Sequence, residues 1–139
     1  MSISAQQQHL PAVSRNPLIT AGRILASLAA LAAFAAALSC VTDISNAGHS
    51  TLVVQTWRMY GLFLCAGLFA LLAKRPQGNG GLWALTIANK LALTLTAIYF
   101  TVVGGIAESA NTLAWDGALT ITLVTAYLLC RTGTRKAFH

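Results

Sequence analysis

Hydrophobic residues in this chain are gathered into four long blocks separated by short polar segments. The blocks cover residues 19–41, 52–73, 82–103 and 113–130. A helix rises about 1.5 Å per residue, so about 20 apolar residues cross the roughly 30 Å hydrocarbon core of a bilayer. The first three blocks reach that length, and the fourth, at about 18 residues, crosses with little tilt. The pattern predicts four transmembrane helices.

The blocks do not alternate apolar and polar residues, as the strands of a membrane β-barrel would. Their backbone groups must therefore bond within helices when they lie in hydrocarbon. Short polar connections favour antiparallel neighbours. The sequence predicts an all-α fold, an antiparallel four-helix transmembrane bundle over residues 18–130. A disordered polar tail is expected at 1–17 and a basic tail at 131–139.

The composition points to the same class of protein. Of the 139 residues, 56% are hydrophobic and only 9% are charged, whereas about 25% of the residues of a soluble domain are charged. No P-loop, nucleophile elbow or zinc-protease motif is present in the sequence. These observations favour an integral membrane protein and weigh against an enzyme, without deciding that question.

The charged residues are distributed unevenly between the two ends of the predicted helices. Seven of the nine basic residues belong to one end: Arg15, Arg23, Lys74, Arg75, Arg131, Arg135 and Lys136. The three acids, Asp43, Glu108 and Asp116, belong to the other. The positive-inside rule therefore predicts a multi-pass protein of the cytoplasmic (inner) membrane with both termini in the cytoplasm. The expected partners of the basic end are anionic lipid headgroups, and not nucleic acid.

Aromatic and small residues indicate how the helices sit in the bilayer. Trp57 and Trp115 fall near the outer ends of their blocks and Trp83 near the inner end of its block. All three match the interfacial belts in which tryptophan is enriched. Small residues recur along the first block at intervals that allow close helix approach. They are Gly22, Ala26, Ala29, Ala30, Ala33 and Ala37.

The cysteines and histidines predict no metal site and no cofactor. Cys40, Cys65 and Cys130 fall at different depths, too far apart for a disulfide, and are expected to act as small apolar filler. The three histidines lie outside the blocks: His9, His49 and His139. A haem held by histidines within the membrane is therefore not expected.

An alternative interpretation makes the first block a lipoprotein signal that is cleaved before Cys40. Ala37 occupies the position where such signals usually carry leucine. The block is also as long as or longer than the roughly 7–15 apolar residues of a signal peptide. We therefore expect the first helix to be retained.

Two basic residues, Arg58 and Lys90, lie well away from the ends of their blocks, at a depth where an ionisable group is costly and often functional. Arg58 shares a helix face with Gln55, and Asp116 falls at a similar depth in the fourth block. Thr120 lies one turn after Asp116 on the same face. These four residues form a candidate polar site that recognises a polar or anionic group. The alternatives are that Arg58 snorkels outward or pairs with another acid, Asp43 or Glu108.

Lys90 is the second deep charge, and no acid is expected at its depth. Asn89, Thr86 and Thr94 lie with it along one side of the third block. This set is either a polar stripe facing other helices or, through Lys90, a contact with lipid phosphate. Counting along straight helices puts Arg58 and Lys90 roughly 13–15 Å apart along the membrane normal. We therefore expect them in separate sites.

The second block also carries Arg58, Gly61 and Gly67, followed by Lys74-Arg75-Pro76. This resembles the R-x-x-G-x-x-x-x-x-G segment of DoxX-like and related four-helix bacterial membrane proteins, whose segment lies in the first helix. The resemblance implies a four-helix fold. For some of these families it also implies accessory roles in redox or stress-linked membrane complexes.

Three functional hypotheses follow. The first is a non-enzymatic accessory or interaction subunit, working as a homo-oligomer or in a larger membrane complex. The second is a small-molecule transporter or channel with a polar path lined by Arg58 and the polar stripe of the third block. The third is a helper of a membrane oxidoreductase that binds quinone near Arg58.

Overall fold

The computed structural model describes residues 16–104, 106 and 109–136. Its helices are α1 (Pro17–Ser45), α2 (Leu52–Lys74), α3 (Gly80–Val103) and α4 (Ser109–Lys136). Each is long and apolar enough to cross a membrane. The predicted all-α four-helix bundle of a multi-pass membrane protein is confirmed.

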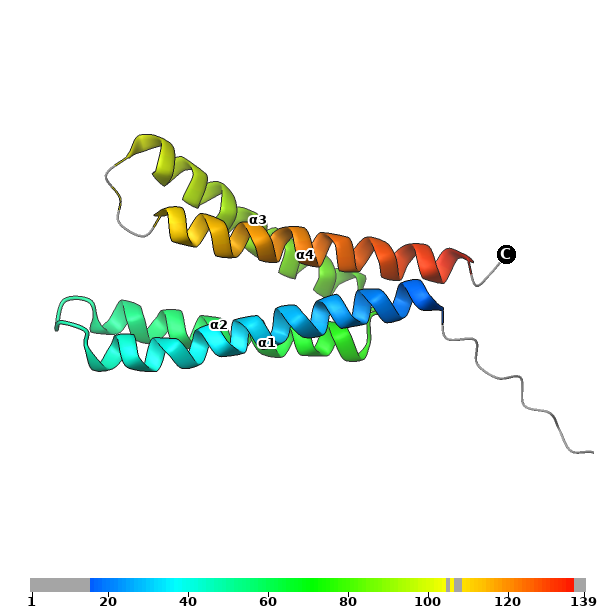
Figure 1. The fold of residues 1–139 in the computed structure, drawn as a ribbon, viewed down its shortest axis with the longest axis horizontal. Helices are drawn as coiled ribbons and strands as arrows, with labels where there is room; N and C mark the ends of the chain where they lie inside the picture. The colour runs from blue at the N-terminus through cyan, green and yellow to red at the C-terminus, as the bar shows by residue number, and fades with distance from the viewer. Residues whose placement is uncertain (1–15, 105, 107–108, 137–139) are drawn as a thin grey trace, which may run out of the picture.

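The helices run antiparallel in chain order, so the bundle has two distinct ends (Figure 1). The start of α1, the α2–α3 turn and the end of α4 lie at one end, which we call the terminal end. The α1–α2 turn, the end of α3 and the start of α4 lie at the other, the loop end. At the terminal end, Asn16 Nδ2 donates to Gly133 O at 2.7 Å and joins the first and last helices.

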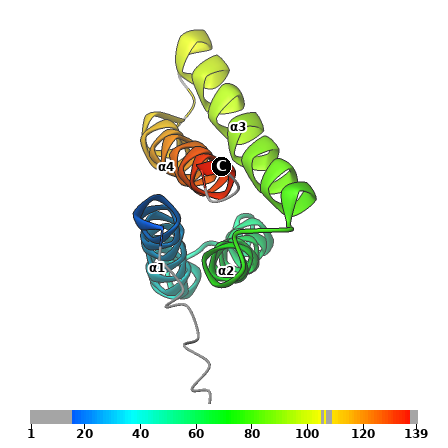
Figure 2. The same cartoon turned by 90° about the vertical axis from the view of Figure 1, so that its right-hand side faces the viewer.

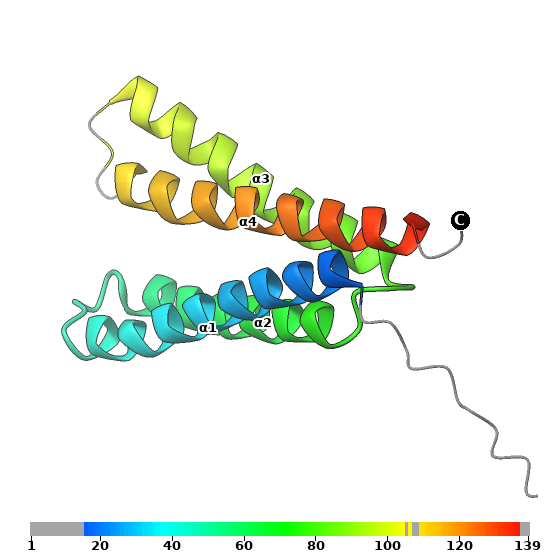
Figure 3. The ribbon, with the colours of Figure 1, turned by 45° about the vertical axis from the view of Figure 1, so that its right-hand side comes forward.

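The four helices do not pack evenly around one axis. α1 packs along both α2 and α4, and α3 packs along α4, whereas α2 and α3 barely touch. The end view shows α3 strongly tilted relative to the other three helices (Figure 2). From a third direction α3 and α4 lie together over the α1–α2 pair (Figure 3). α3 is therefore attached to the bundle mainly through α4.

Two helices extend beyond their apolar blocks. α1 begins at Pro17, where Asn16 Oδ1 caps the helix by accepting from Leu18 N at 3.1 Å, and it continues through polar residues to Ser45. α4 ends at Lys136, so residues 131–136 of the expected basic tail continue the helix. The rest of that tail, and residues 1–15 of the expected polar tail, lie outside the described residues. Arginine and lysine are good helix formers, and cations are favoured near a helix C-terminus. Hydropathy marks the membrane-facing stretch and not the helix end.

The buried face of α1 is built from small residues, and the large apolar residues of this helix face outward. Ala26, Ala33 and Ala37 of α1 are at most 1% exposed, whereas Leu31 on the same helix is 65% exposed. Gly22 lies where α1 crosses α4, and a Cβ built there would be 2.8 Å from Ala126 O. Lipid is as apolar as leucine, so close packing of small residues is what brings such helices together. The expected small-residue stripe of α1 is confirmed as a packing surface.

Trp83 departs from its predicted position in an interfacial belt. The side chain is 1% exposed, and its indole Nε1 donates to Pro76 O at 3.0 Å. Its ring packs against Tyr127 with 5.7 Å between centroids. Trp57 and Trp115, in contrast, are 73% and 51% exposed. Depth alone does not decide whether a tryptophan faces lipid, because the rotation of its helix also matters.

Candidate functional site

A central cavity of about 820 Å³ lies between the helices, and all four contribute to its wall. Leucine and alanine side chains form most of the wall, for example Leu62, Leu93 and Ala36. Into this apolar wall the helices set eight polar side chains: Gln55, Arg58, Thr86, Asn89, Lys90, Asn111, Thr112 and Asp116. Apolar walls with a few polar groups, in a volume of roughly 300–1,000 Å³, are typical of small-molecule sites.

An ion pair between α3 and α4 lies at the cavity wall. Lys90 Nζ donates to Asp116 Oδ1 at 2.7 Å, and the two side chains are 3% and 13% exposed. The expectation that Lys90 lacks an acidic neighbour and reaches for lipid phosphate is therefore wrong. Lys90 belongs to a polar stripe that faces the bundle, and its charge is neutralised inside the protein.

Arg58 and Lys90 line the same cavity, so the expectation of two separate sites is also wrong. Arg58 is six residues into α2, about 9 Å from its start, and Asp116 is seven residues into α4, about 10 Å from its start. Lys90 reaches that depth because α3 is tilted (Figure 2) and because the lysine side chain is long. Counting residues along straight helices misses both effects.

Thr94 and Thr120 form a second polar link between α3 and α4. Their hydroxyl oxygens are 3.1 Å apart, and Thr120 Oγ1 donates to Asp116 O at 2.7 Å. Thr94 Oγ1 donates to Lys90 O at 2.8 Å. Each threonine lies one turn after the charged residue of its own helix, and their contact joins α3 and α4 a second time. Thr120, which the sequence places in the polar site, supports that site and is not among the residues that line the cavity.

The cavity is closed toward the terminal end. A packed layer lies beyond its deepest residues, made of four side chains that are at most 1% exposed: Phe69, Leu72, Trp83 and Leu123. On its side the cavity is open, because Leu64 and Leu85 both line it and are 65% and 66% exposed. These two leucines come from α2 and α3, the helices that barely touch. The geometry is that of a vestibule with a lateral opening toward lipid.

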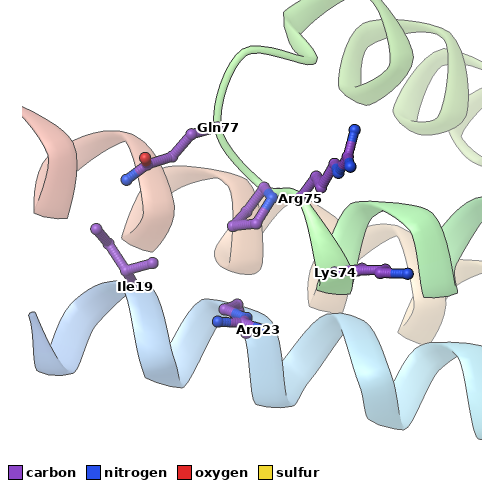
Figure 4. A pocket seen from close by; sticks show the side chains of 6 residues that line it. Ile19, Arg23, Lys74, Arg75 and Gln77 are labelled. Atoms are coloured by element: carbon purple, nitrogen blue, oxygen red, sulfur yellow. The ribbon is translucent and has the colours of Figure 1, made fainter. Parts of the chain in front are cut away.

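A separate basic pocket of about 360 Å³ lies at the terminal end. Figure 4 shows Arg23 rising from α1, while Lys74 and Arg75 extend in different directions from the end of α2. Arg23 Nε donates to Ala73 O at 2.9 Å. This bond satisfies one of the carbonyls that the end of a helix leaves without an intrahelical partner.

The remaining sequence candidates lie elsewhere. Cys40, Cys65 and Cys130 are free thiols, and Cys65 alone of the three lines the central cavity. Asp43 is exposed near the end of α1, and Glu108 lies outside the described residues. Within the described part of the chain, His, Cys, Asp and Glu side chains form no group of three that would suit a metal ion.

No protein-family model matches this chain, and no curated protein or solved structure is significantly similar to it. The site therefore has to be interpreted from its own geometry. The resemblance to DoxX-like proteins stays a prediction.

Proposed function

We propose that this membrane protein is a carrier that binds a small molecule in its central cavity. The observation that carries the proposal is the cavity itself, which combines apolar walls with polar side chains within the membrane-spanning helices. Polar residues at such depth are costly, and they are retained where they line a path or bind a ligand. Of the three hypotheses from the sequence, the transporter is the one that this arrangement favours.

The shape of the cavity supports a carrier over an open channel. A channel needs a continuous path, whereas the packed layer of Phe69, Leu72, Trp83 and Leu123 closes this cavity toward the terminal end. A carrier exposes its site to one side at a time. An accessory subunit would need a partner surface and no cavity.

The accessibility of Cys65 tests the carrier. In a variant with Cys40→Ala and Cys130→Ala, Cys65 is the only thiol and it lines the cavity. We expect a membrane-impermeant methanethiosulfonate to modify Cys65 quickly from the loop-end face, because the cavity extends to Val54 and Asn111 in the first turns of α2 and α4. We expect slower modification from the terminal-end face, because the packed layer must open first. Right-side-out and inverted vesicles give the two rates.

The matched control is Ile121→Cys in the variant that also carries Cys65→Ala. Ile121 is 71% exposed on the outer face of α4, where lipid excludes a charged reagent, so no modification is expected. Reaction of Cys65 from the loop-end face alone would reduce the site to a binding pocket and contradict the carrier. Failure to react from either face would contradict the proposal altogether.

We also propose that the terminal end faces the cytoplasm, where its basic side chains contact anionic lipid headgroups. Arg23, Lys74 and Arg75 line one pocket at this end, and basic residues near a helix end are attracted to anionic lipids. A green fluorescent protein joined after His139 is expected to fluoresce, and an alkaline phosphatase at the same place to be inactive. The phosphatase inserted after Gly48, in the α1–α2 turn, is expected to be active. An active phosphatase after His139 would reverse the orientation.

A further inference from the structure

Two buried polar atoms of the described residues have no hydrogen-bond partner, and both belong to residues that line the central cavity. They are Thr86 Oγ1 and Gln55 Oε1. Thr86 is the more deeply placed, at 3% exposure. An unpartnered buried hydroxyl costs about 1–3 kcal/mol. Such atoms in the wall of a cavity indicate that something else supplies the partner.

The hydroxyl of Thr86 differs from those of the other threonines of α3. Thr94, Thr96 and Thr101 each donate to the carbonyl four residues earlier in the helix, at 2.8–2.9 Å. This backbone bond is the usual way to satisfy a threonine within a helix. Thr86 makes no such bond. Its hydroxyl is therefore free to donate to, or accept from, a molecule in the cavity.

The surroundings of Thr86 restrict the charge of that molecule. Lys90 lies one helical turn further along α3, and its charge is already balanced by Asp116 at 2.7 Å. A charged group at Thr86 would have to break this pair, displace the existing interactions of Arg58 in the same cavity, or stay buried without a counter-ion, and each is costly. The lateral opening at Leu64 and Leu85 faces lipid. The ligand therefore enters from the bilayer as an uncharged molecule.

We propose that the central cavity binds a neutral amphiphile from the bilayer, whose hydroxyl or carbonyl group hydrogen-bonds to Thr86 while its apolar body lies along the leucine wall. This proposal rests on the proposed function and names the substrate class of the same cavity. Thr86 is a binding residue in this scheme, and the Lys90–Asp116 pair sets the selectivity against charged analogues.

Fluorescence of Trp115, which lines the cavity, tests this ligand class in lipid nanodiscs. In the Trp57→Phe variant we expect 11-bromoundecan-1-ol to quench this fluorescence saturably. The matched acid and trimethylammonium compounds have the same chain length. Because Trp115 is half exposed, they are expected to quench it from the bilayer in proportion to their concentration, without saturation. The additional variant Trp115→Phe should lose the saturable quenching by the alcohol. Equal quenching by all three compounds would overturn the proposal.

Thr86→Val removes only the hydroxyl and is expected to raise the half-quenching concentration of the alcohol about tenfold, the loss of one hydrogen bond of about 1.4 kcal/mol. Thr86→Ser should restore binding. Thr122→Val, on α4 outside the cavity lining, should change nothing. The melting temperature of Thr86→Val should not fall, because its hydroxyl has no partner in the protein. Unchanged quenching in Thr86→Val would contradict the ligand class even if Cys65 reacts as a carrier requires.

Discussion

Replacing Lys90 by methionine is expected to destabilise the bundle by about 3–5 kcal/mol, the range measured when one partner of a buried ion pair is removed. Asp116, which is 13% exposed and accepts from Lys90 Nζ at 2.7 Å, would lose the cation that balances it. Its carboxylate would then have to stay charged in a poor environment or take up a proton. Unfolding of the purified protein by a titration of denaturing detergent measures the loss.

The double variant Lys90→Met/Asp116→Leu provides the decisive comparison. Removing both charges leaves no unbalanced ion, so most of the lost stability should return. Lys74→Met, at the exposed end of α2, is the control for removing a lysine and should change the stability by no more than about 0.5 kcal/mol. A double variant as unstable as Lys90→Met would show that the pair is not what stabilises this region.

Gly22→Ala is expected to destabilise the protein by about 1–3 kcal/mol, the usual cost of overpacking. The new Cβ would lie 2.5 Å from Cys130 Sγ and 2.8 Å from Ala126 O. The thiol can move, but the carbonyl belongs to the backbone of α4. α1 and α4 must therefore separate along their crossing. Thermal unfolding in detergent, compared with wild type, gives the effect.

Gly67→Ala on α2 is the matched control, because a Cβ at Gly67 meets nothing within 4 Å. This substitution should be neutral or stabilising by up to about 1 kcal/mol, since alanine is the better helix former. Adding Cys130→Ala to Gly22→Ala should restore little of the lost stability, because the new Cβ would still lie too close to Ala126 O. Equal melting temperatures for Gly22→Ala and Gly67→Ala would contradict a close crossing of α1 and α4.

The sequence predicted the elements of this fold because each transmembrane helix is a long local signal. Four apolar blocks, their short connections and the small residues of α1 were sufficient for the bundle. The ends of α4 were misplaced because hydropathy reports the hydrocarbon boundary, and a helix continues through residues such as Arg131 without a change in backbone geometry. Trp83 was misplaced because a belt position depends on how its helix is rotated.

The candidate site was predicted in its parts and missed as a whole. Arg58 and Lys90 were each recognised as costly at their depth, and Asp116 was placed at a depth similar to that of Arg58. Their meeting in one cavity depends on the tilt of α3, which is a tertiary property with no local pattern. One feature of the sequence could have predicted the contact between Lys90 and Asp116. A lysine buried in the membrane needs an acid to balance its charge, and no acid is present in its own helix, so a neighbouring helix has to supply one.

The attachment of α3 through α4 has a consequence for how the chain enters the membrane during synthesis. α3 leaves the ribosome carrying Lys90 before the segment with Asp116 has been made, and a lone lysine at the centre of a bilayer costs about 2.5–3.5 kcal/mol on insertion scales. α2 offers α3 little contact in the meantime. We therefore expect α3 to insert more favourably together with α4 than alone, because Asp116 then balances the charge of Lys90.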